Sequence, residues 1–147
     1  FYQEKITYPI KNKIDADINK VFSRININSN VILKCDIEGD EYLIIDQILD
    51  YSNRIQMLIF EFHWIDKNES KFIESIKKLQ KKYEIIHIHA NNHYQTLKGG
   101  LPIILEITLL NKKFSTNKKE YVDNFPIKDL DFPNNPTLED IEFSFKH

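Results

Sequence analysis

Acidic and imidazole side chains gather at the ends of three apolar runs in this 147-residue chain. They are Asp36 and Glu38 after the first run, Glu61 and His63 at the end of the second, and His87, His89, Asn91 and His93 at and after the end of the third. Carboxylates and imidazoles together can hold a cation, or supply a general base that works near neutral pH. Either kind of chemistry requires a fold that brings the three ends together.

The elements that carry these residues alternate between strand and helix. Residues 31–37, 55–64 and 83–88 have the nearly continuous apolar character of strands covered on both faces. Between them, apolar residues recur at a period near 3.6 from Asp40 and again after the capping residues that begin at Asn68, which predicts two helices. This alternation is typical of a parallel α/β sheet, in which ligands bind beyond the carboxyl ends of the strands.

The remaining segments complete the predicted fold. Residues 103–110 predict a fourth strand, which returns antiparallel because the segment before it contains Gly99 and Gly100 and no helical pattern. A short strand at 6–10 and a helix carrying apolar residues from 14 to 25 precede the sheet. We expect one α/β domain over residues 1–113 and an irregular arm over residues 114–147 with a short helix near 137–143.

Several of the polar residues also have purely structural interpretations. Glu61 is either a functional carboxylate or the ion-pair partner of Lys34 on a neighbouring strand. Asp40 and Glu41 suit the start of a helix, where negative charge is favourable. Asp36 favours function, because an unpaired carboxylate beside a buried strand would be costly. A functional role and a structural role are both open for His63, His89 and Asn91. His87 suits a packed strand position. His93 and Tyr94 suit the surface of a loop. Trp64 is either a pocket wall or a core residue.

Composition narrows the class of protein. A formal net charge of −2 argues against a broad basic face and hence against a nucleic-acid partner. The single cysteine, Cys35, lies in an apolar run and predicts a buried thiol in a reducing compartment, so we expect a cytoplasmic protein. The sequence contains neither an apolar stretch long enough to span a membrane nor a zinc-binding, phosphate-binding glycine or serine-hydrolase motif.

Three segments in order are similar to one known family. Residues 33–41 resemble the Leu-Lys-x-Asp-x-Glu-Gly-x-Glu segment of FkbM-type S-adenosylmethionine methyltransferases, and Phe60-Glu61-Phe62-His63 resembles the end of that family's next strand. His89-Ala90-Asn91-Asn92 and the segment from Pro102 to Thr108 are similar to its later histidine-asparagine and Pro-x-x-Leu-Glu-x-Thr segments. The resemblance covers roughly residues 31–110.

The resemblance implies a Rossmann-like methyltransferase sheet whose last strand is antiparallel. It also implies S-adenosylmethionine as cofactor and methyl transfer to a hydroxyl of a sugar or similar small molecule. By position, Asp36 and Glu38 would lie at the cofactor, with Asp36 and His63 as catalytic residues. The predicted acceptor contacts are Glu61, Trp64, His89 and Asn91. A divalent cation is compatible with this family but has no motif of its own here.

The chain departs from the family in its first thirty residues. The family's Asp-x-Gly-x-x-x-Gly cofactor loop is absent, and the only methionine is Met57. We therefore expect the C-terminal half of a methyltransferase domain, completed by an N-terminal half or a second copy, with one edge of its sheet exposed. The alternatives are a non-catalytic binding or dimerisation module, and a small metal-dependent enzyme that uses Asp36, Glu61 and His63.

Overall fold

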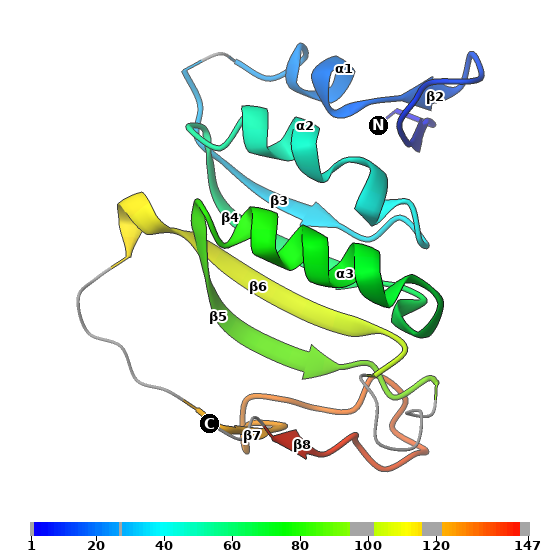
Figure 1. Ribbon diagram of the computed structural model, residues 1–147, viewed down its shortest axis with the longest axis vertical. Helices are drawn as coiled ribbons and strands as arrows, with labels where there is room; N and C mark the ends of the chain where they lie inside the picture. The colour runs from blue at the N-terminus through cyan, green and yellow to red at the C-terminus, as the bar shows by residue number, and fades with distance from the viewer. Residues whose placement is uncertain (1, 27, 95–101, 116–121, 145–147) are drawn as a thin grey trace.

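The protein is built around one four-stranded sheet, as the computed structural model shows for residues 2–26, 28–94, 102–115 and 122–144 (Figure 1). The strands are β3 (Val31–Cys35), β4 (Ile55–Phe62), β5 (Tyr83–Ala90) and β6 (Leu105–Asn111), in the spatial order β3-β4-β6-β5. β3 pairs with β4 in parallel, and β6 pairs antiparallel with both β4 and β5. The predicted α/β class and the antiparallel direction of the last strand are confirmed.

β3, β4 and β5 run in one direction and the last strand is antiparallel, as predicted, but the position of β6 makes the pairing of the sheet mixed. β6 lies between β4 and β5, so β3–β4 is the one parallel pair among the three pairs of this sheet. β5 runs in the direction of β4 because a helical crossover connects them, but the place beside β4 is occupied by the returning strand. The predicted turn at Gly99 and Gly100 lies outside the described residues.

Helices α2 (Ile45–Asp50) and α3 (Ile65–Leu79) cover one face of the sheet (Figure 1). The helix predicted from Asp40 is divided into the 3-10 helix η1 (Glu41–Leu43) and α2. The second helix begins at Ile65 rather than at the predicted cap. Asn68 instead has a non-helical backbone (φ −127°, ψ 23°) within α3, and its side chain donates to the Trp64 carbonyl at 3.0 Å. No helix in the described segments has the length and apolar composition needed to cross a bilayer.

The core lies between these helices and the sheet. Alternate residues of β4 and β6, among them Phe60, Phe62 and Ile107, are buried there, and the edge of the Phe72 ring meets the Phe62 ring at 5.3 Å. The other residues of both strands point to the opposite face. On β3, which is an edge strand, Ile32 is 63% exposed, so the prediction that this strand is covered on both faces is wrong.

The first thirty residues are less regular than predicted. β1 (Lys5–Ile6) pairs in parallel with β2 (Asp15–Ala16), and α1 (Ile18–Phe22) follows. The predicted strand at 6–10 is thus reduced to a two-residue pairing. The predicted helix is also shorter, because Asp17 acts as its N-cap and accepts from the Lys20 N–H at 2.8 Å.

The C-terminal arm lies beside β5 (Figure 1). It includes β7 (Asn124–Phe125) and β8 (Phe143–Ser144), which pair antiparallel, after the short helix η2 (Lys112–Phe114). The helix predicted near 137–143 is wrong. The carbonyls of Asn135, Leu138 and Glu139 accept from the side chain of Asn92 in a non-helical conformation.

Candidate functional site

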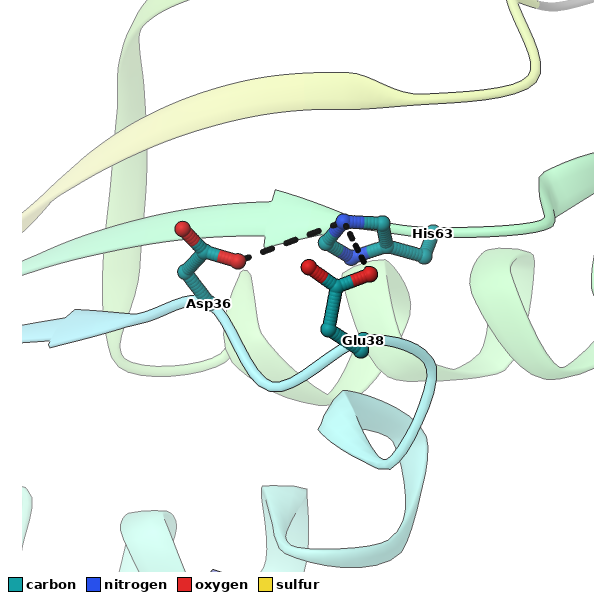
Figure 2. Close-up of side chains that lie close together, drawn as sticks. All are labelled: Asp36, Glu38 and His63. Atoms are coloured by element: carbon teal, nitrogen blue, oxygen red, sulfur yellow. Dashed lines mark ion pairs between the residues drawn. The ribbon is translucent and has the colours of Figure 1, made fainter.

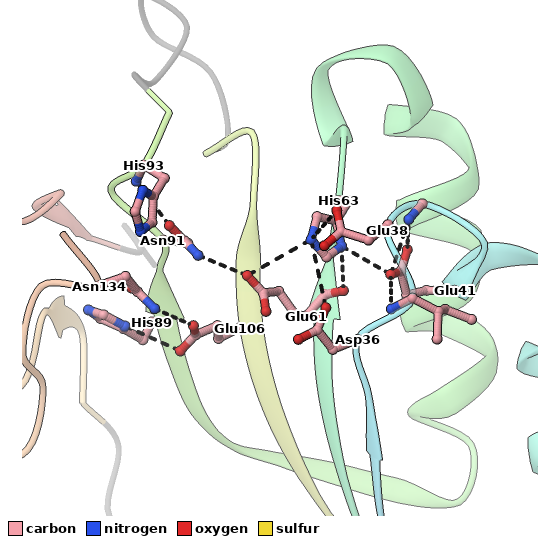
Figure 3. A network of polar contacts seen from close by, with 12 residues as sticks. Asp36, Glu38, Glu41, Glu61, His63, His89, Asn91, His93, Glu106 and Asn134 are labelled. Carbon is pink, nitrogen blue, oxygen red and sulfur yellow. Dashed lines mark hydrogen bonds and ion pairs between the residues drawn. The ribbon is translucent and has the colours of Figure 1, made fainter. Parts of the chain in front are cut away.

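The carboxyl ends of β3, β4 and β5 meet at one rim of the sheet, as predicted (Figure 3). Asp36 follows β3, Glu61 and His63 lie at the end of β4, and Asn91 follows β5. β6 runs in the opposite direction, so its beginning lies at the same rim and adds Glu106, which sequence reasoning did not select. Hydrogen bonds and ion pairs connect Asn91, Glu61, His63 and Asp36 along the rim, and Glu106 pairs instead with His89 and Asn134 (Figure 3).

A tight turn after β3 organises one end of the rim. Glu38 (φ 58°) and Gly39 (φ 107°) both have left-handed backbone conformations, and for a side-chain-bearing residue such as Glu38 this conformation is uncommon. A Cβ atom at Gly39 would lie 3.0 Å from Cδ1 of Trp64. The positive φ and the close approach of Trp64 therefore both favour glycine at this position.

Glu41 is the buried centre of that turn. Its side chain is fully buried and accepts from the N–H groups of Ile37 and Gly39, both at 3.0 Å. It also contacts Nδ1 of His63 at 3.0 Å. The prediction of a helix-start charge missed this role, because the side chain turns back into the loop. The sequence signal for this role is the position of Glu41, which is the last glutamate of the Leu-Lys-x-Asp-x-Glu-Gly-x-Glu segment.

His63 faces the acidic residues with one free ring nitrogen. The residue is 3% exposed, and its Nδ1 contacts Oε1 of Glu41 at 3.0 Å and the Glu61 carbonyl at 3.1 Å. Because the carbonyl and an ionised carboxylate only accept, we assign the proton to Nδ1. Nε2 then carries a lone pair.

Three carboxylates surround that lone pair. Nε2 lies 3.6 Å from Glu38 and 4.0 Å from Asp36 (Figure 2), and 3.9 Å from Glu61, each beyond hydrogen-bond distance. The Glu38 side chain is 79% exposed and that of Asp36 34% exposed, so the cluster is open to solvent on one side. The predicted catalytic and cofactor residues are thus neighbours in space.

Glu61 connects this cluster to the end of β5. Its Oε1 accepts from Nδ2 of Asn91 at 2.8 Å. The alternative pairing with Lys34 is not formed, since Nζ of Lys34 lies 3.6 Å from Asp36. Burial raises the pKa of Glu61, the negative charge of Asp36 adds to this effect, and the Asn91 hydrogen bond opposes it.

His89 joins the sheet to the C-terminal arm. Its Nδ1 lies 3.4 Å from Glu106 and its Nε2 lies 3.1 Å from Asp140. The Glu106 hydrogen bond and, after it, the Asp140 hydrogen bond raise the pKa of His89 to about 9 against the opposing effect of burial. Both nitrogens are occupied, so in this arrangement His89 anchors the arm.

His87 and His93 lie outside the cluster. Nε2 of His87 is 2.8 Å from Asp131 of the arm, and its side chain is 25% exposed, in agreement with the predicted strand role. His93 is exposed, as predicted for loop surface. Among the histidines in the described part of the chain, His63 is therefore the one whose imidazole is available at this rim.

Trp64 forms a wall beside the turn. It takes a left-handed conformation (φ 55°) immediately before α3, and its ring meets the Tyr94 ring edge-on at 5.3 Å between centroids. Tyr94 also lines a hollow whose other wall is residues 138–142 of the arm. Trp64 thus lies at the rim, between the acidic cluster and this hollow.

Cys35 ends β3 on the buried face of the sheet. It is 4% exposed, and burial raises the pKa of its thiol, with the charges of Glu41 and Asp36 acting in the same direction. A protonated thiol is a poor nucleophile and a poor metal ligand. The predicted structural role is therefore confirmed.

The rim offers two kinds of chemistry. The lone pair of His63 can accept a proton from a hydroxyl, or it can join the nearby carboxylates around a cation.

Comparison of the chain with models of known families, with curated proteins and with solved structures found no match.

Proposed function

We propose that this chain is the acceptor-binding part of an S-adenosylmethionine-dependent methyltransferase that acts on a hydroxyl of a sugar or a similar small molecule. The observation that carries the proposal is the open cluster at the rim, where Nε2 of His63 faces Asp36, Glu38 and Glu61 at 3.6–4.0 Å. The three segments that resemble the family supply residues of this one rim. The antiparallel last strand agrees with the same resemblance.

The cluster suits the proton chemistry of such a transfer. When bound, S-adenosylmethionine supplies a methyl group to the acceptor oxygen, which must lose its proton. Nε2 of His63 can take that proton, because Glu41 holds Nδ1–H and would stabilise the imidazolium that results. The rest of the proposed contribution to the transfer rate comes from holding the acceptor hydroxyl beside this nitrogen.

The residues present fit one side of the proposed cofactor site. Asp36 and Glu38 would lie at the boundary between cofactor and acceptor, where the turn opens to solvent. The sequence contains no glycine-rich loop for the remainder of the cofactor. We therefore propose that other residues of the protein, or a second copy, complete that side.

The aromatic wall suits a ring-shaped acceptor. Trp64 and Tyr94 meet at 5.3 Å and lead from the acidic cluster to the hollow beside the arm. Asn91 is hydrogen-bonded to Glu61 at 2.8 Å and offers a polar contact on the same path. A sugar placed along this wall would present a hydroxyl to His63.

Calorimetry and a transfer assay test the proposal. The purified full-length protein is expected to bind S-adenosylmethionine and to transfer labelled methyl groups to members of a panel of saccharides. Asp36→Ala and His63→Asn should each lower the transfer rate by roughly 100-fold or more, with circular dichroism unchanged. Glu74→Gln, in an exposed side chain of α3, is the matched control and should retain the full rate.

Two outcomes contradict the proposal. Wild-type rates in Asp36→Ala would remove its assigned role. Absence of S-adenosylmethionine binding by the wild-type protein would exclude the enzyme and leave the non-catalytic binding or dimerisation module as the better account.

A further inference from the structure

We infer that Asp36, Glu38 and His63 form a divalent-cation site at the rim, with Glu61 as a fourth ligand. The side chains of the first three place ligand atoms within 4.8 Å of one another (Figure 2). Binding of the ion follows from the arrangement of these side chains, whereas a catalytic role for the ion rests on the proposed methyl transfer.

His63 is prepared for a metal by its hydrogen bonds. It is 3% exposed, and within the described part of the chain its Nε2 has carboxylates at 3.6–4.0 Å but no hydrogen-bond partner. The Glu41 carboxylate holds the proton on Nδ1 and so directs the lone pair of Nε2 into the cluster. A carboxylate behind a histidine ligand is the common arrangement in metal sites, where it sets the tautomer and the ring orientation.

The separations lie between those of neighbouring and of opposite ligands around one ion, so the carboxylates would move inward when an ion binds. An ion about 2.0–2.2 Å from its nitrogen and oxygen ligands separates neighbouring ligands by about 3 Å and opposite ones by about 4.2 Å. The distances from Nε2 to Glu38, Glu61 and Asp36 are 3.6, 3.9 and 4.0 Å. A small rotation of the Glu38 side chain, which is 79% exposed, can close the remaining gap.

The charges also favour a cation. Three carboxylates meet at this point, and the positive side chain paired with one of them is Lys34, whose Nζ lies 3.6 Å from Asp36 and whose side chain is 66% exposed. Lys34 can therefore turn into solvent when a more highly charged ion binds. The left-handed backbone of Glu38 (φ 58°) is an uncommon conformation for this residue, and it occurs where its carboxylate approaches His63.

The ligand set indicates the class of ion. One imidazole with two or three carboxylates and no thiolate suits Mn²⁺ or a similar ion that prefers oxygen ligands but accepts nitrogen. The open side of the cluster leaves room for water or for a hydroxyl of the acceptor. With the ion bound, Nε2 of His63 is a ligand and no longer the base of the proposed transfer. The ion would instead lower the pKa of a bound hydroxyl, so that the O–H bond breaks and its proton passes to water while the O–CH3 bond forms and the methyl–sulfur bond breaks.

Titration of the purified, chelator-treated protein with Mn²⁺ tests the site. The electron paramagnetic resonance signal of free Mn²⁺ reports binding without any need for catalysis. The wild-type protein should bind one ion, and Glu38→Gln or Asp36→Asn should each weaken binding by about 10-fold or more, with the double variant losing it. Both carboxylates are partly or largely exposed, so these changes should preserve the fold.

Control variants distinguish this site from nonspecific attraction of Mn²⁺ to acidic side chains elsewhere on the surface. Glu74→Gln removes an exposed carboxylate on α3 and should leave the Mn²⁺ affinity unchanged. His63→Asn should abolish binding while Glu61→Gln weakens it. Circular dichroism and thermal unfolding check that each variant is folded. Displacement of Mn²⁺ by Mg²⁺ or Zn²⁺ gives the preference of the site.

The outcomes are separable from those of the proposed function. Failure of the wild-type protein to bind Mn²⁺ at about 1 mM, or equal affinity in the Asp36→Asn/Glu38→Gln variant, would overturn the cation site. Mn²⁺ binding that these variants abolish, in a protein that does not bind S-adenosylmethionine, would support the cation site and refute the methyltransferase.

Discussion

At the scale of single residues, Glu41 has the greatest influence on the rim. One fully buried carboxylate satisfies the N–H groups of Ile37 and Gly39 and orients the ring of His63. Burying a carboxylate is costly unless several donors compensate, and here backbone and side chain both contribute. Loop geometry and ring orientation consequently depend on the same side chain.

Glu41→Gln should lower the free energy of unfolding by about 2–4 kcal/mol. The amide keeps the size of the side chain but lacks the negative charge and places an N–H2 group where acceptors are needed. Urea denaturation measures the change, and Glu74→Gln on the exposed side of α3 should stay within about 0.5 kcal/mol of wild type. Equal stability of the two variants would contradict the role given to Glu41.

At the scale of elements, Asn92 connects the end of β5 to the arm. Its Nδ2 donates to the carbonyls of Asn135 and Glu139 at 3.0 and 3.1 Å, and to that of Leu138 at 3.3 Å. Its Oδ1 accepts from the N–H of Asn135 at 2.7 Å. The side chain is 4% exposed, so water does not replace these partners easily.

Asn92→Ala should therefore loosen the arm and lower the free energy of unfolding by about 1–3 kcal/mol. Trypsin cleavage after Lys128, an exposed residue of the arm, should become faster, because cleavage requires local opening. Cleavage is followed by mass spectrometry. His93→Ala changes the neighbouring exposed side chain and should cleave at the wild-type rate. If both variants cleave equally fast, Asn92 does not anchor the arm.

At the scale of the whole molecule, histidine–carboxylate pairs hold the sheet and the arm together. His89 lies between Glu106 on β6 and Asp140 on the arm, and His87 lies 2.8 Å from Asp131. Nδ2 of Asn134 donates to Glu106 at 2.7 Å and adds a further link. Stability of this part of the molecule should depend on the charge of His89.

The stability should fall as the pH rises through about 9. The pKa of His89 is raised to about 9, above its ordinary value of 6.5. Its contribution to the free energy of unfolding is therefore complete below pH 6.5 and is lost as the pH rises from there through about 9. The full contribution is about 3 kcal/mol. The pKa of Glu106 is lowered, chiefly by the His89 hydrogen bond, so its contribution is lost only in acid.

Urea denaturation at several pH values between 6.5 and 9.5 measures this dependence. His89→Gln removes the titrating group and serves as the comparison, because other groups titrate alike in both proteins. The difference in stability between the two proteins should shrink as the pH rises. A difference that stays constant over this range would contradict the assigned pairing.

The sequence by itself determined the α/β class, the strand–helix alternation and the rim at which polar residues meet. These follow from local periodicity and from the rule that parallel strands present their carboxyl ends together. It also identified Asp36, Glu38 and His63 as neighbours, because each follows a buried strand.

Only the tertiary structure decided which partners these residues take. Glu41 turns back into the loop, β6 enters between β4 and β5, and His89 is bound by residues from the arm. Each of these contacts joins segments that are distant in sequence or depends on one backbone turn, so periodicity carries no signal for it. The free lone pair of His63 is likewise visible only once its Nδ1 partner is known.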